Sequence, residues 1–300
     1  MSSAVVESPT MIAKVKTWWT ILRISLEERL VYRGDFALGT LMRFLPIVTQ
    51  IFLWYAIFEA VEAAQAVEAA QDAGAVEARN GVIDIVGYSY HDMVAYYLLT
   101  MLSRAFSSMP ALASGIALQV RDGEIKKYLV QPIDLLGFLL LSRIAHKLAY
   151  YSVAIIPFAL VFYLCGNYFP EWPHWTTMLA YIASLVMGFM MGFFLEAAIG
   201  LFSFWFLEVT SLLFVYMLLS FFLSGHMFPL DFLPQPWNQL VEFLPFRYLA
   251  YFPSAVWLGK IQGADLYRGL LIEVCWVAFF IVLSRVMLAR GIRRYSGFGG

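Results

Sequence analysis

The feature that most constrains this chain is the length of its apolar runs. The longest covers residues 176–225, where Glu196 and Glu208 are the only acidic or basic interruptions. A transmembrane helix needs about 20 apolar residues, so this run is long enough for two spans joined by a hairpin at about 198–208. Other apolar runs recur on both sides of it. The sequence therefore predicts six spans, at residues 36–58, 93–112, 147–165, 176–198, 208–225 and 266–288.

The overall composition agrees with that interpretation. Hydrophobic residues make up 61% of the chain and charged residues only 14%, and the mean hydropathy is +0.73. A soluble protein of this length needs a far more charged surface. We therefore expect an all-α membrane protein, with one transmembrane domain over residues 1–300 in contact with membrane lipid. Nothing in the sequence indicates binding to nucleic acid.

Residues 11–32 have the pattern of an amphipathic helix that precedes the first span. Apolar residues, among them Val15, Trp19 and Leu22, recur at three- and four-residue spacing, and charged residues fill much of the rest. Basic residues together with tryptophan favour a helix that lies in the headgroup layer. The alternative is a soluble helix that binds a partner. After the first span, an alanine- and glutamate-rich insert at 60–78 predicts a helical continuation outside the membrane.

A short polar segment, residues 118–134, lies between long apolar runs. Its sequence is LQVRDGEIKKYLVQPID. Because Lys and Arg are enriched in cytoplasmic loops, this segment is expected at the cytoplasmic face. It has the composition of a short helix that binds a soluble partner, and the simpler alternative is an ordinary basic loop.

Residues 226–259, here called the outer segment, are punctuated by five prolines. The aromatic-rich pieces between the prolines are too short to cross a bilayer, which is typical of re-entrant or interfacial helices. Residues 236–243 begin with proline, a residue favoured at the first position of a helix. A second short helix is expected within residues 246–258.

The distribution of cations predicts six spans with both termini in the cytoplasm. The predicted cytoplasmic cations are Lys14, Lys16, Arg23, Arg29, Arg33, Arg121, Lys126, Lys127, Arg290, Arg293 and Arg294, with Arg285 at the border. The predicted outer segments carry Arg79, Arg247, Lys260 and Arg268.

Among the charged residues within or beside the predicted spans, Arg104, Glu196 and Glu273 are the ones considered for a role inside the membrane. Ionisable residues in a membrane usually face protein or water. Arg104 lies close enough to the cytoplasmic end of its span to reach the headgroups, so a structural role and a substrate contact both remain open. The same two roles are open for Glu273.

Motifs of chemical catalysis are absent from the sequence. There is no GxxxxGK[ST] phosphate loop, no HExxH and no GxSxG, and the two cysteines, Cys165 and Cys275, have no metal-ligand spacing. We therefore expect no enzyme activity and no cofactor in this chain, and active transport would need an ion gradient or a separate ATPase. A secondary transporter or channel is the alternative, but no repeated halves and no midplane acid–base chain are visible.

Three phrases resemble the permeases of type-2 ATP-binding-cassette (ABC) exporters: RDGEIKKYLVQPID at 121–134, GHMFPLDFLPQPW at 225–237 and LPFRYLAYFPSAVWLG at 244–259. The order of elements is similar as well, with an N-terminal interface helix, a coupling segment between spans two and three, and a broken helix between spans five and six. The resemblance implies a second permease chain, identical or related, and separate ATPase subunits that bind ATP and Mg²⁺, in the inner membrane of a bacterium.

The resemblance also assigns roles to residues. The segment that docks on the ATPase would comprise Arg121, Asp122, Gly123, Glu124, Ile125, Lys126, Lys127, Tyr128 and Leu129, with Ile125, Tyr128 and Leu129 as apolar anchors. In a two-chain transporter the outer segment would lie over the outer opening of the path. We expect it to form a gate, with breaks and contacts at Pro229, Pro234, Pro236, Trp237 and Pro245.

Overall fold

The computed structural model describes residues 11–31, 33–71, 84–131, 133–169, 172–206 and 208–295. Within these residues every regular element is a helix, and the one β interaction is an isolated bridge between Ile85 and Tyr88. The expected all-α class is therefore confirmed. In the same ranges, four helices are long and apolar enough to cross a membrane, over Leu38–Gln65, Leu135–Leu164, Trp175–Phe204 and Gly263–Arg294.

The chain folds into two compact units. Unit 1 comprises Met1–Met42 and Lys126–Ala159, and unit 2 comprises Arg43–Ile125 and Leu160–Gly300. Helix α2 (Arg33–Gln71) begins in unit 1 and continues in unit 2. Its end at Gln71 agrees with the helical continuation predicted from the alanine-rich insert, whose later residues lie outside the described ranges.

Unit 1 contains α1 (Met11–Leu30), α5 (Lys126–Leu129) and most of α6 (Leu135–Leu164). Helix α6 begins directly after Asp134, which accepts a hydrogen bond from the backbone N–H of Gly137 at 2.8 Å and so caps the first turn. On α1, the side chains of Val15 and Trp19 are exposed. That exposure is compatible with a helix in the headgroup layer, which stays a prediction.

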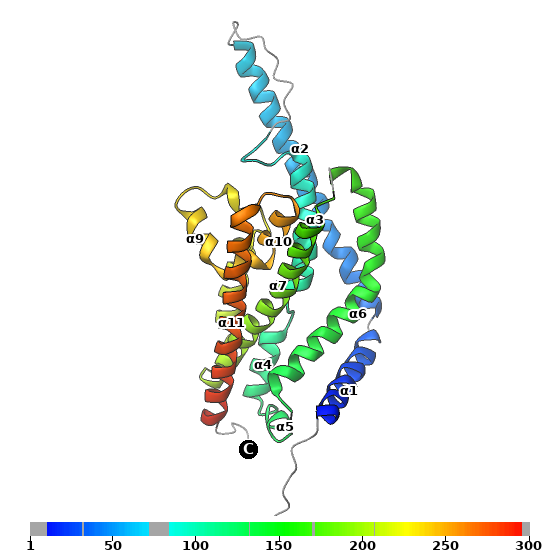
Figure 1. The fold of residues 1–300 in the computed structure, drawn as a ribbon, viewed down its shortest axis with the longest axis vertical. Helices are drawn as coiled ribbons and strands as arrows, with labels where there is room; N and C mark the ends of the chain where they lie inside the picture. Colours follow the sequence, from blue (N-terminus) through cyan, green and yellow to red (C-terminus); the bar gives the residue numbers. More distant parts are fainter. Residues whose placement is uncertain are drawn as a thin grey trace, which may run out of the picture. The chain divides into compact units, whose positions relative to one another are not determined.

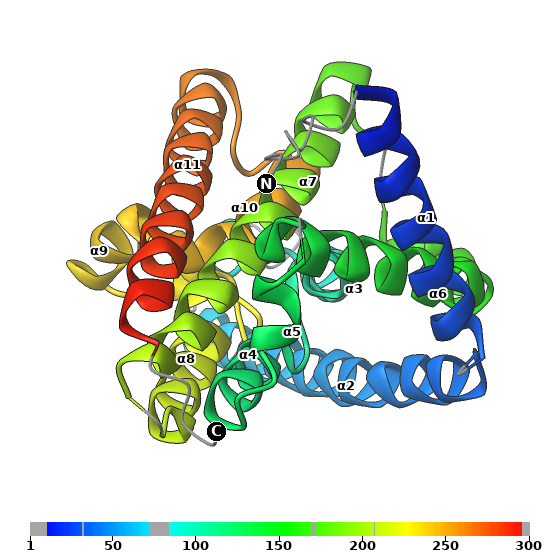
Figure 2. The same ribbon diagram turned by 90° about the horizontal axis from the view of Figure 1, so that it is seen from below.

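Unit 2 is built around α7 (Trp175–Leu201), which contacts α3 (Tyr90–Ser107), α4 (Leu112–Arg121), α10 (Tyr251–Trp257) and α11 (Gly263–Arg294). Seen from below, α7 passes between α11 and α3 (Figure 2). Glycine allows two of these contacts. A Cβ on Gly200 would lie 2.8 Å from the carbonyl oxygen of Ala113 in α4, and one on Gly192 would overlap the carbonyl of Ser107 in α3. Small residues permit this close backbone approach.

Helix α3 is shorter and more polar than the span predicted at 93–112. A capping box between Ser89 and Asp92 starts it. It ends at Ser107, and the chain breaks at Pro110 and at Ala111, which has a φ of 60°, before α4 begins. At 18 residues α3 is about 27 Å long, and it contains both Asp92 and Arg104. Its hydropathy is too low for it to count among the four apolar helices of span length.

Helix α8 (Thr210–Leu223) is the other predicted span that falls short. Its 14 residues cover about 21 Å, less than the roughly 30 Å of bilayer hydrocarbon. The connection between η2 (Phe202–Phe204) and α8 lies close to the predicted hairpin at 198–208. Because α8 begins only at Thr210, it is shorter than the predicted span 208–225. In the described ranges, four helices therefore have the length and composition of a span, and the total of six spans stays a prediction.

The outer segment folds as short helices, as the prolines predict. Pro229 precedes η3 (Leu230–Phe232), Pro236 caps α9 (Trp237–Phe243), and Pro245 starts η4 (Pro245–Leu249). The piece expected within 246–258 is divided at Ala250 into η4 and α10. In unit 2, α9, α10 and the first turns of α11 lie at the end opposite α4 (Figure 1).

Candidate functional site

The polar segment 118–134 contains the boundary between the two units, so its halves are described separately. In unit 2, Arg121 at the end of α4 pairs with Asp122 at 3.2 Å, and both side chains are about half exposed. Gly123 has a φ of 76°, which suits glycine and ends the helix. Ile125 is only 1% exposed. Its side chain is therefore packed inside the protein and is not presented as a docking anchor.

In unit 1 the segment continues as α5. Lys126 and Lys127 are exposed, as is Val130, whose side chain is 82% exposed. The ring of Tyr128 packs on Phe138 with centroids 5.3 Å apart, and the Lys127 ammonium lies 5.3 Å from the Tyr128 centroid. This half therefore presents two cations beside a partly covered aromatic ring. Pro132 lies outside the described residues.

The outer segment is held to α3 by tyrosine hydroxyls. Tyr96 donates a hydrogen bond to the carbonyl oxygen of Gly225, the residue just before the segment, and Tyr97 donates to that of Met227 at 2.5 Å. The Tyr97 hydroxyl also accepts a hydrogen bond from Trp54 of α2 at 2.7 Å. Further along α3, Ser107 donates to the carbonyl of Leu249 at 2.8 Å. These bonds satisfy backbone carbonyls of irregular structure, which bilayer hydrocarbon cannot do.

Asp231 is the polar centre of the outer segment. Its two carboxylate oxygens accept hydrogen bonds from Tyr88 at 2.6 Å and from Tyr251 at 2.7 Å. Burial raises the pKa of Tyr88 well above its usual value, and the neighbouring Tyr251 and Asp231 add to that shift. Tyr88 therefore remains a hydrogen-bond donor at all physiological pH values.

Lys260 ties the start of α3 to the chain that follows α10. Its ammonium group donates to Asp92 at 2.9 Å and to the carbonyl of Gly87 at 2.6 Å, and it lies 4.9 Å from the Tyr88 ring centroid. Together with Arg247 and Arg268 it borders a polar cavity of about 200 Å³ that also contains Asp231, Glu242 and Asp265. Three of the cations assigned to the outer side by sequence thus gather in one place.

The three charges predicted inside the membrane have different surroundings. Arg104 donates to Ser220 of α8 at 3.1 Å and borders a cavity of about 530 Å³ with Gln50 and His226. Glu196 accepts a hydrogen bond from Tyr216 at 3.3 Å. Glu273 is completely buried, and its carboxylate has no hydrogen-bond partner among the residues that the structure describes.

The predicted gate residues do not share one surface. Pro245 is buried, whereas Trp237 is 58% exposed and lies on α9 with Leu240 and Phe243, which are also more than half exposed. The remaining three, Pro229, Pro234 and Pro236, lie in the turns before η3 and α9. They act as breaks between the short helices.

Comparison with known proteins decides the family. A family model described as ABC-2 family transporter protein matches residues 78–299, about three quarters of the chain. The chain belongs to the ABC-2 transporter family. No curated protein matches it. The match confirms the resemblance to type-2 ABC permeases and takes in both the polar segment and the outer segment of this multi-pass membrane protein.

Several residues that this ABC-2 protein uses to hold the outer segment are hard to recognise from sequence. Tyr88, Tyr96, Tyr97 and Tyr251 look like the aromatic residues of any membrane protein, and Asp231 looks like a solvent-exposed acid. A usable signal was the density of tyrosine in YSYHDMVAYY at 88–97, which exceeds what an aromatic belt at a span end requires. Among the described residues, no group of three or more His, Cys, Asp or Glu side chains could hold a metal ion.

Proposed function

We propose that the chain is the permease subunit of an ATP-driven exporter and forms half of a dimeric translocation path. The observation that carries this proposal is the family match over residues 78–299. The sequence contains no phosphate loop, so ATP and Mg²⁺ are assigned to separate ATPase subunits. The subunit belongs in the inner membrane of a bacterium, with six spans and both termini in the cytoplasm.

In this proposal α3 and α8 are the second and fifth spans. The polar groups of α3 have protein partners: its tyrosines bond to the outer segment and Arg104 bonds to Ser220. A span whose polar side chains are paired inside the protein does not need high hydropathy. Helix α8 is short, and a short apolar helix is accommodated in a bilayer by local thinning.

The ATPase would dock on residues 118–134. In unit 1 the exposed groups suited to docking are the cations Lys126 and Lys127 and the apolar side chain of Val130. In unit 2, Arg121 and Leu118 are exposed. Because Ile125 is buried, the partly exposed Tyr128 and Leu129 take the role of anchors. An apolar centre with a charged rim is the usual composition of a protein interface.

A charge reversal tests this docking site. The variant Lys126→Glu/Lys127→Glu should lose most co-purification with the ATPase encoded beside the permease, because unfavourable charge pairs in an interface cost several kcal/mol. The matched control is Arg293→Glu/Arg294→Glu, which makes the same change of charge at exposed positions at the end of α11. Unchanged binding and unchanged transport-linked ATP hydrolysis in the first variant would place the docking site elsewhere.

The outer segment would form the outer gate. Its first residues are tied through Met227 to α3 and through Asp231 to Tyr88, whereas α9 exposes an apolar face of Trp237, Leu240 and Phe243. We assign the moving role to α9, which is bounded by Pro236 and Pro245. In a symmetric dimer, a disulfide between Asn238→Cys in the two permease chains should block transport and leave ATPase binding intact. Full transport with the cross-link formed would contradict the gate and leave the segment only the role of a membrane anchor.

A further inference from the structure

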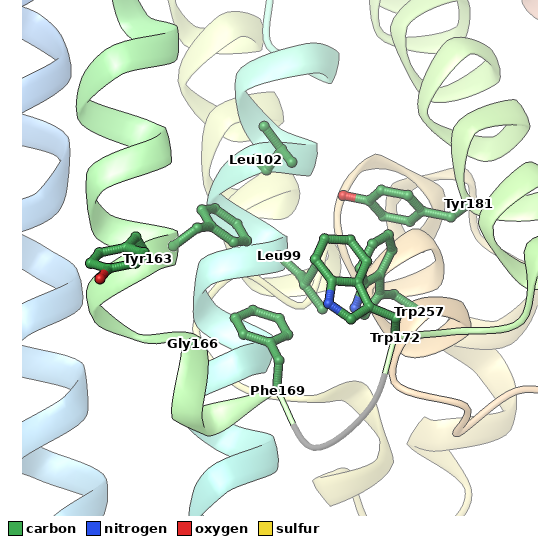
Figure 3. A pocket seen from close by; sticks show the side chains of 9 residues that line it. Leu99, Leu102, Tyr163, Gly166, Phe169, Trp172, Tyr181 and Trp257 are labelled. Atoms are coloured by element: carbon green, nitrogen blue, oxygen red, sulfur yellow. The ribbon is translucent and has the colours of Figure 1, made fainter.

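Unit 2 contains an apolar cavity that the transport proposal does not use. It has a volume of about 310 Å³, which falls within the range of sites for small molecules. The lining residues come from α3, the end of α6, α7, α10 and the turn that joins α6 to α7: Leu99, Leu102, Phe162, Tyr163, Gly166, Phe169, Trp172, Tyr181 and Trp257. Figure 3 shows these side chains around the space.

The walls of the cavity are aromatic and carry no charge. On one side Phe162 stacks on Phe169 with centroids 5.5 Å apart. On the other side Trp257 contacts Trp172 at 5.9 Å and Tyr181 at 4.9 Å between centroids. None of the nine lining residues is acidic or basic, so nothing in the wall would compensate a buried charge. The ligand must therefore present an apolar surface.

The position of the cavity indicates where that ligand comes from. It lies at the end of α6 and the start of α7, two of the four helices that can cross a membrane. Tyr163 and Trp172, at its edge, are 85% and 81% exposed. Exposed tyrosine and tryptophan at the ends of spans mark the boundary between headgroups and hydrocarbon. The cavity is therefore open to the layer where phospholipid chains begin.

We propose that this cavity binds one acyl chain of a phospholipid from the surrounding bilayer. A lipid chain would contact the aromatic and aliphatic side chains that form most of the wall. The headgroup would remain outside, beside Trp172 and Tyr163, whose polar atoms suit that boundary. The site depends only on membrane insertion and not on the direction or the energy source of transport.

The test uses the full-length protein in nanodiscs that contain phosphatidylcholine with a photoactivatable diazirine in one acyl chain. After irradiation, the sites of lipid attachment are mapped by peptide mass spectrometry. We expect attachment at Leu99, Leu102, Phe162 or Trp257, which line the cavity. Attachment confined to lipid-facing residues outside it, such as Leu164, would overturn the proposal on the wild-type protein alone.

A matched pair of variants strengthens the result. Leu102→Trp adds an indole to the cavity wall and should lower attachment at the lining residues by about tenfold or more, since the added ring occupies the space. Leu164→Trp makes the same substitution at an exposed position near the end of α6 and should leave attachment at the lining residues unchanged. Equal attachment in both variants would contradict an acyl chain in this cavity. Elution as a single peak in gel filtration checks that each variant is folded.

Discussion

Replacing Asp231 is the sharpest test of how the outer segment is held. The variant Asp231→Ala removes the acceptor of two hydrogen bonds, from Tyr88 at 2.6 Å and from Tyr251 at 2.7 Å. A hydrogen bond to a charged group contributes about 1.5–3 kcal/mol. Asp231 is only partly buried and the two bonds share one carboxylate, so the lower end applies, and the loss is about 3 kcal/mol for the pair.

That loss should appear as faster local opening. A change of about 3 kcal/mol corresponds to roughly a hundredfold change in an equilibrium constant. The backbone N–H of Tyr251 bonds to the carbonyl of Ser224 at 2.9 Å, and that of Phe232 bonds to Pro229 at 3.1 Å. Both amides should therefore exchange hydrogen about a hundredfold faster in the variant, because their exchange requires the segment to open.

Two further variants define the cause. Asp231→Asn keeps one acceptor oxygen and should produce an intermediate rate. Asp84→Asn changes an exposed carboxylate before α3 and should leave both amides as in the wild-type protein. If the amides of Tyr251 and Phe232 exchanged hydrogen in Asp231→Ala at the wild-type rate, the two tyrosine hydrogen bonds would not hold the segment. That result would refute the reasoning from their geometry.

Three other predictions concern topology, packing and pH. In a background of Cys165→Ser and Cys275→Ser, single cysteines at Asp72 and Lys126 should react with an impermeant maleimide from opposite sides of the membrane, and labelling from the same side would contradict six spans. Gly192→Ala should destabilise the protein by about 1–3 kcal/mol in thermal unfolding because its Cβ would overlap the Ser107 carbonyl. The control Gly115→Ala, with open space at its Cβ, should not. Burial raises the pKa of Tyr88 above the usual value of 10. The contribution of the neutral Tyr88 side chain to folding stability is therefore complete below pH 10 and falls as the pH rises further. Tyr88→Phe should show a smaller fall between pH 9 and 11 than the wild-type protein, and equal curves would contradict the shift.

Local sequence signals predicted most of the helices. The proline at 236 marked the start of α9, and the five prolines of the outer segment indicated its division into short helices. These signals are local because a cap or a proline acts on the backbone within one turn. The resumption of helix as α4 after Pro110 was not predicted, since the buried face of α4 depends on contact with α7.

The contents of the candidate sites were less predictable. The family resemblance implies that Ile125 is an exposed anchor beside Tyr128, yet Ile125 is buried in the folded chain. The partnership of Asp231 with Tyr88 joins residues 143 positions apart, and no local pattern encodes it. Tertiary contacts of this kind decide which polar groups are satisfied, and they cannot be read from hydropathy alone.

The bonds from α3 to the outer segment have a consequence for how such a protein can change over generations. Tyr96 and Tyr97 bind main-chain carbonyls of Gly225 and Met227, which every amino acid at those positions would supply. The side chains at 227 and 228 can therefore change by mutation while the hydrogen bonds from Tyr96 and Tyr97 of α3 are retained. Gly225 is the exception, because its φ of 76° suits glycine and a Cβ there would lie 2.6 Å from that of Tyr251. Descendants that handle different cargo can thus diversify the surface of this loop while two tyrosines and one glycine keep it in place.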